Sequence, residues 1–136
     1  SVAAQGDAVL VGWYTAAGDT PRVQLARSDD AGDAFAEPVV LDSGPAVQGR
    51  VAVALDQAQA WAVWLREDDA GGQSLWLSRR SPDLSTEYER IELARLQGRG
   101  RATGFPQLQV LGGQAYVVWT DVIDGAPQLQ GARLVR

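Results

Sequence analysis

The sequence of 136 residues contains no cysteine, histidine, methionine, lysine or asparagine. The absence of cysteine excludes disulfide and thiolate chemistry. Without histidine or cysteine there is no Ser-His-Asp triad, no Cys-His pair and no ordinary zinc site. Without lysine the chain has neither a Schiff base nor a complete phosphate-binding P-loop. The side chains left for catalysis are those of Asp, Glu, Tyr, Ser and Arg, and we expect no metal and no cofactor.

Positive charge is also scarce. All 12 basic residues are arginines. The chain has 17 acidic residues, so the net charge is −5. A chain of this balance offers no basic surface to a phosphate backbone, so nucleic acid is not an expected partner. No apolar run approaches the roughly 20 residues that span a bilayer, and we expect no membrane span. The chain starts at Ser1 without a signal-like segment, which indicates a processed chain or a fragment.

The remaining composition indicates one soluble β-rich domain. The chain is 46% hydrophobic and 21% charged, and its 15 glycines and 6 prolines predict many turns between short elements. An all-β fold is therefore the first expectation.

Three apolar runs that end in tryptophan repeat along the chain. They cover Val9–Trp13, Trp61–Trp64 and Tyr116–Trp119, and their last tryptophans lie 51 and 55 residues apart. A second set of segments, each ending in arginine, keeps nearly the same spacing of 52 and 54 residues. These segments are Arg22–Arg27, Ser74–Arg79 and Gln128–Arg133. A unit of just over fifty residues therefore occurs three times.

Each unit contains about four strand-like segments separated by turn residues, and the third unit lacks the fourth segment. Repeated four-stranded units of this length are typical of the blades of a β-propeller. We predict three antiparallel blades at residues 1–45, 46–99 and 100–136. A β-sandwich is the alternative, but it gives no reason for a repeat that keeps its register. The nearly continuous apolar residues of the tryptophan runs predict strands that are covered on both faces.

Serine, aspartate and an aromatic residue recur at the same offsets after the first two arginine segments. They are Ser28, Asp30, Gly32 and Phe35 in the first copy and Ser81, Asp83 and Tyr88 in the second. In the first copy the aspartate can accept backbone N–H groups, Gly32 permits a positive φ angle, and we expect Phe35 to enter the blade core. A calcium loop is the alternative, but the required ligand spacing and closing Glu are absent.

The first copy resembles the Asp-box, S-x-D-x-G-x-x-[FWY], of bacterial sialidase-like propellers, and the second is similar to a degenerate copy. Two further segments, Gly49–Leu55 and Thr103–Leu108, extend the resemblance to the C-terminal half of a six-bladed propeller of that family. The resemblance implies that the boxes are structural hairpins on the face opposite the active site. It also implies an extracytoplasmic location, periplasmic or secreted.

Three blades do not close a ring, and each end blade would expose an apolar face. We expect a homodimer, or a second chain or missing N-terminal half, to complete the ring. In such a ring the connections between blades and the loops between second and third strands share one face. The ligand-binding candidates on that face are Arg50, Arg101, Arg22, Asp68 and Asp121.

Arg50 is the strongest of these candidates, because it opens an inner strand beside the channel. An equal alternative is that it caps a sheet edge or pairs with a neighbouring acid. By contrast, Arg27, Arg79 and Arg133 recur at one place in every unit, which indicates a structural position. No catalytic residue is assigned. Two functions remain: a non-catalytic propeller module that binds a glycan or a protein or acts as a scaffold, or part of an exo-sialidase or related glycosidase, in which arginines would hold a substrate carboxylate.

Overall fold

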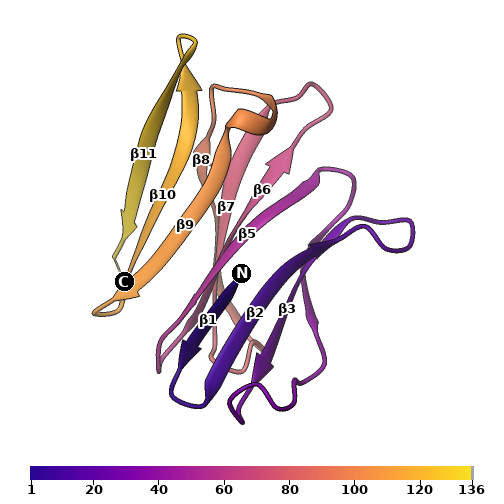
Figure 1. Ribbon diagram of the computed structural model, residues 1–136, viewed down its shortest axis with the longest axis vertical. Coiled ribbons are helices and arrows are strands. Elements are labelled where there is room, and N and C mark those ends of the chain that lie inside the picture. The colour runs from indigo at the N-terminus through magenta and orange to yellow at the C-terminus, as the bar shows by residue number, and fades with distance from the viewer. Residues whose placement is uncertain (136) are drawn as a thin grey trace.

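The computed structural model describes residues 1–135 as three antiparallel β-sheets that follow one another along the chain (Figure 1). Sheet A contains β1 (Val2–Gln5), β2 (Ala8–Thr15), β3 (Arg22–Ser28) and β4 (Val39–Ser43). Sheet B contains β5 (Val47–Leu55), β6 (Ala60–Glu67), β7 (Gln73–Arg80) and β8 (Glu87–Arg95). Sheet C contains β9 (Gly104–Leu111), β10 (Gln114–Ile123) and β11 (Ala126–Leu134).

Each sheet is a simple meander in which every strand pairs with its neighbour in sequence. The all-β prediction is confirmed, and the tryptophan runs form the second strand of each sheet, β2, β6 and β10. The arginine segments lie in the third strands, β3, β7 and β11. A short 3₁₀ turn, η1 (Gly100–Ala102), lies between sheets B and C. None of the described residues forms a helix long and apolar enough to cross a membrane.

Sheet B is packed between the other two sheets, and this position decides where the core lies. All residues from Ala60 to Leu65 on β6 are buried, because successive side chains point alternately to sheet A and to sheet C. Trp64 belongs to the cluster shared with sheet A, and Trp61 belongs to the cluster shared with sheet C. The prediction of strands covered on both faces therefore holds for β6. It is wrong for β2 and β10, whose side chains alternate between buried and more exposed.

Sheets A and C each keep one face that no other described sheet covers. On sheet A this face carries Val11 and Trp13 from β2, and on sheet C it carries Tyr116 and Val118, each 40% exposed, from β10. The expectation that Phe35 enters the blade core is wrong, because the ring is 45% exposed and lies on this uncovered face with Val11 and Trp13. No described sheet lies against that side of sheet A.

The two serine-aspartate segments form closely similar turns between the third and fourth strands of sheets A and B. In the first turn the Ser28 hydroxyl donates to Asp30 Oδ1 over 2.7 Å and accepts the Gly32 N–H over 2.9 Å. In the second turn the Ser81 hydroxyl donates to Asp83 Oδ1 over 2.7 Å. Tyr88, which ends the second copy, is 49% exposed and lies under the Arg79 guanidinium, 5.2 Å from ring centre to Cζ.

These turns make the two aspartates more acidic. Hydrogen bonds from the Ser85 hydroxyl, the Ser81 hydroxyl and the Ser85 N–H lower the pKa of Asp83 to about 2. In the first turn the Ala34 N–H and the Ser28 hydroxyl likewise lower the pKa of Asp30. Both carboxylates are therefore ionised turn-forming groups at neutral pH.

The depressed pKa of Asp83 predicts a pH-dependent contribution to stability. Because the unfolded chain binds this proton near pH 4 and the folded chain only near pH 2, the stabilisation is complete above pH 4 and is lost as the pH falls toward 2. We expect Asp83→Asn to lower Tm at pH 7 and to match the unchanged protein near pH 2, as measured by thermal unfolding. Asp33→Asn, at an exposed aspartate of the first turn, is the control and should show no such convergence.

Candidate functional site

One end of the three sheets gathers the loops between second and third strands and the connections from one sheet to the next (Figure 1). This is the arrangement that the repeat predicted. Each of the five ligand-binding candidates lies at or near this end, but they do not form one cluster. Arg22 begins β3 and its Nε is buried without a partner among the described residues, whereas Arg101 is exposed in η1.

The two acidic candidates both accept backbone N–H groups. Asp68 Oδ1 accepts the N–H groups of Ala70 and Gly72 over 3.0 and 2.8 Å and so closes the β6–β7 loop. Asp121 is buried, with 4% of its surface exposed. These contacts favour structural roles for both carboxylates over direct contact with a ligand.

Asp121 ties sheet C to the connection that leaves sheet B. Its Oδ2 accepts the Gln97 N–H over 2.9 Å, and its Oδ1 accepts the N–H groups of Gly98 and Val122 over 2.8 and 2.7 Å. A carboxylate with three backbone donors is a strong local anchor, because charged hydrogen bonds exceed neutral ones in strength.

Arg50 is the candidate whose surroundings suggest a binding site. It lies on β5, the inner strand of sheet B, and its guanidinium stacks on the Phe105 ring of β9 with Cζ 4.3 Å from the ring centre. Its Nη1 also donates to the Thr103 carbonyl. Thr103 is itself fixed by its hydroxyl, which donates to the buried Gln73 side chain. The stack therefore joins the inner strands of two sheets.

Arg50 and Phe105 share an uncommon backbone conformation. Arg50 has a φ of 49° and follows Gly49 at 80°, and Phe105 has a φ of 53° and follows Gly104 at 92°. The strand register is interrupted beside both pairs. Left-handed residues other than glycine carry backbone strain, and such strain is concentrated at functional sites. A strained pair at the same place in two repeats therefore marks a candidate site.

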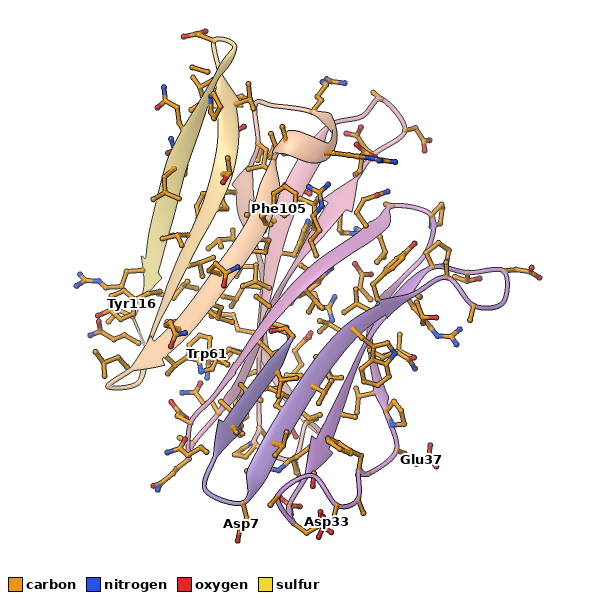
Figure 2. All side chains as sticks on the ribbon, viewed as in Figure 1. Asp7, Asp33, Glu37, Trp61, Phe105 and Tyr116 are labelled. Atoms are coloured by element: carbon orange, nitrogen blue, oxygen red, sulfur yellow. The ribbon has the colours of Figure 1, made fainter. Side chains whose placement is uncertain are left out.

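Phe105 was not among the predicted ligand-binding residues, although it completes this site. The available signal was the spacing of 55 residues between Gly49-Arg50 and Gly104-Phe105, which matches the repeat. Figure 2 shows Phe105 at the beginning of β9. Its ring is 51% exposed, and Tyr14, which packs directly against Gly49, is 42% exposed. We call Tyr14, Gly49, Arg50 and Phe105 the inner-strand site.

The inner strands are otherwise uncharged. Arg50 is the one charged residue within β1, β5 and β9. Farther along, the same three strands line a groove of about 500 Å³, formed by residues 2–5, 53–56 and 108–113. Asp56 lies at the end of this groove, but its Oδ1 accepts the N–H groups of Ala58 and Gln59 in the β5–β6 turn. The described groove therefore contains no pair of free carboxylates.

Comparison with known proteins supports the fold and leaves the family open. No protein-family model matches the sequence, and no curated protein matches it. Solved structures with a similar fold include a GH43 endo-arabinanase from Bacillus licheniformis, 13% identical with a TM-score of 0.60, and an endo-arabinase from Bacteroides thetaiotaomicron, 17% identical with a TM-score of 0.59. Both matches cover 97% of this chain, and they cover 49% and 54% of the respective neighbours.

The chain has a propeller-like fold, which it shares with these two glycoside hydrolases. It spans about half the length of the solved structures that it matches. The expectation of a propeller is thus supported, but the likeness is not specific to sialidases. The number of blades in a complete ring stays a prediction.

Close packing of Tyr14 on Gly49 gives a test of the site's backbone. A Cβ atom at Gly49 would lie 2.7 Å from Tyr14 Cβ, whereas a Cβ at Gly18, with a similar φ of 79°, would meet nothing within 4 Å. We expect Gly49→Ala to destabilise the protein by about 2–4 kcal/mol and Gly18→Ala by about 1 kcal/mol, measured by urea unfolding. Equal losses would show that Tyr14 moves aside freely.

The anchor at Asp121 gives a second test. Asp121→Ala leaves three backbone N–H groups without their acceptor, so we expect a loss of about 3 kcal/mol in the free energy of unfolding. Asp69→Ala, in the exposed part of the β6–β7 loop, should change stability by less than about 0.5 kcal/mol. If Asp121→Ala lowers the free energy of unfolding no more than Asp69→Ala does, Asp121 is not an anchor between the sheets.

Proposed function

We propose that this chain is a non-catalytic propeller module that binds an acidic glycan at the inner-strand site. The observation that carries the proposal is the Arg50–Phe105 stack, in which a guanidinium and an exposed aromatic ring stand together on inner strands that carry no carboxylate. In this proposal Arg50 holds a carboxylate of the glycan, and Phe105 and Tyr14 pack on the sugar.

The chemistry of Arg50 suits an anionic ligand. Among the described residues its one hydrogen bond is that from Nη1 to Thr103, so other guanidinium N–H groups are left to donate. A planar guanidinium can donate two parallel hydrogen bonds to a carboxylate, and the Phe105 ring below it limits its rotation. The Thr103 carbonyl fixes it from the side. A preorganised arginine loses less conformational entropy on binding.

The absence of paired carboxylates favours binding over hydrolysis. Most glycoside hydrolases use two carboxyl groups about 5–9.5 Å apart across the scissile bond. Within the described inner strands, Arg50 is the one charged group, and the candidates Asp68 and Asp121 accept backbone N–H groups. These observations support a binding role for the described inner strands, on which no pair of carboxyl groups lies.

Part of a glycoside hydrolase, of sialidase type or another type, is the second candidate function. It is favoured by the fold that this chain shares with propeller glycosidases, of which it spans about half. In that case further blades would supply the carboxylates, and Arg50 would position the substrate. Turnover of a fluorogenic sialoside or arabinoside that Arg50→Ala abolishes would favour this function and contradict the non-catalytic one.

Binding measurements test the proposed function directly. We expect the purified protein to bind an acidic oligosaccharide, sialyllactose or trigalacturonic acid, more tightly than neutral lactose in isothermal titration calorimetry. Arg50→Gln should weaken this binding by about 10- to 100-fold, because a charged hydrogen-bond donor is lost. The matched control is Arg95→Gln on the outer strand β8, at a side chain that is 73% exposed.

Two results would contradict the proposal. One is equal affinity for the acidic and neutral oligosaccharides, and the other is equal weakening by Arg50→Gln and Arg95→Gln. Circular dichroism of each variant checks that the sheets are intact, because Arg50 also bonds to Thr103.

A further inference from the structure

Residues 103–105 form one wall of the inner-strand site (Figure 2). The Phe105 ring centre lies 4.3 Å from Arg50 Cζ, and the Thr103 carbonyl accepts a hydrogen bond from Arg50 Nη1. Gly104 lies between them, and a Cβ atom at this glycine would be 3.2 Å from Arg50 Nη1. The guanidinium therefore lies against all three residues, and its orientation depends on where this short segment is held.

Thr103 is the buried end of this segment and is held from two sides. Its methyl group packs against Gly98, where an added Cβ atom would overlap it. Gly98 is in turn held by Asp121, whose Oδ1 accepts the Gly98 N–H over 2.8 Å. The Thr103 hydroxyl donates to Oε1 of Gln73. Packing thus places the methyl group, and the hydrogen bond to Gln73 places the hydroxyl, of the residue whose carbonyl Arg50 uses.

Gln73 is a buried polar side chain whose amide has partners at both ends. It begins β7 and is 4% exposed. Its Nε2 donates to the Gly100 carbonyl over 2.9 Å and to Glu67 Oε1 over 3.3 Å. Because a carbonyl can only accept a hydrogen bond, Nε2 must face Gly100, and Oε1 must face the Thr103 hydroxyl. The amide therefore links the end of β6, the turn η1 and the entry to β9.

A second buried glutamine provides a comparison. Gln59, which is 1% exposed, precedes β6, whereas Gln73 pairs with Glu67 at the other end of that strand. The Gln59 Oε1 accepts Arg79 Nη1 over 2.7 Å, and its Nε2 has no partner among the described residues. Gln59 thus holds an arginine away from the inner-strand site, whereas Gln73 is linked through Thr103 to Arg50.

We propose that Gln73 is the positioning residue of the inner-strand site. Through Thr103 it holds the segment that orients the Arg50 guanidinium, so that the remaining guanidinium N–H groups face an anionic group of the ligand. Gln73 itself is buried and acts only through these two hydrogen bonds. A donor held in its bound orientation loses less conformational entropy on binding. This inference rests on the proposed function, because its ligand is the acidic glycan of that site.

The first test observes Arg50 without any ligand, through the resonance of its Nε–H group in an NMR spectrum. Arg50→Gln lacks this resonance and so identifies it. Gln73→Met keeps the length of the side chain but removes its donor and its acceptor, and we expect the Arg50 resonance to move toward that of an exposed arginine. Gln59→Met is the matched control. It removes another buried amide and should leave the Arg50 resonance unchanged.

The second test measures affinity by isothermal titration calorimetry with sialyllactose and trigalacturonic acid. We expect Gln73→Met to weaken binding of the acidic oligosaccharide by about 10-fold and Gln59→Met to leave it unchanged. Thr103→Val, which removes the hydroxyl and keeps the shape, should match Gln73→Met, and Thr103→Ser, which keeps the hydroxyl, should retain affinity. The double variant of Gln73→Met and Thr103→Val should lose no more than either alone, because both remove one hydrogen bond.

The outcomes separate the positioning role from the proposed function. An unmoved Arg50 resonance in Gln73→Met and Thr103→Val, or equal affinities of Gln73→Met and Gln59→Met, would overturn the positioning role even if the unchanged protein binds the oligosaccharide. A moved resonance in a protein that binds neither oligosaccharide would support the placement of Arg50 by Gln73 and contradict the proposed function. If Gln73→Met does not fold, the comparison of Thr103→Val with Thr103→Ser decides.

Discussion

The structure depends on the burial of strand β6 from both sides. Its two tryptophans point in opposite directions, Trp64 into the cluster with sheet A and Trp61 into the cluster with sheet C. Large aromatic side chains contribute a dominant part of the apolar area that a core removes from water. Because one strand supplies both clusters, sheets A and C pack on opposite faces of the same element.

The inner-strand site is a product of this packing. The Arg50 side chain extends from sheet B and stacks on Phe105 of sheet C. The stack therefore forms only when the two sheets pack together. Both residues adopt positive φ angles after a glycine, and the surrounding contacts to Thr103 and Tyr14 hold that conformation. The strain is thus supported by the interface itself, which explains how an arginine and an aromatic ring remain presented at the same place.

Polar contacts between the sheets are made by buried or half-buried carboxylates that accept hydrogen bonds across an interface. Asp42 joins sheet A to Trp64 and to Arg66 of sheet B, and Asp121 joins sheet C to the chain that leaves sheet B. Each is a carboxylate with low exposure and several donors, which fixes the relative position of two sheets more narrowly than apolar packing does. Trp61, at the interface between B and C, is buried with no described acceptor for its indole N–H.

The sequence by itself determined the strands and their grouping. Alternation, turn residues and a repeat of just over fifty residues are local signals, and β2, β6 and β10 lie where the tryptophan runs predicted them. It did not determine which side chains are available to a ligand. Asp121 and Asp68 are ligand-binding candidates in the sequence but accept backbone N–H groups in the structure, whereas Phe105 was not a candidate and is exposed beside Arg50. Tertiary structure decided these points, because hydrogen-bond partners and the covering of a sheet face come from residues far away in the chain.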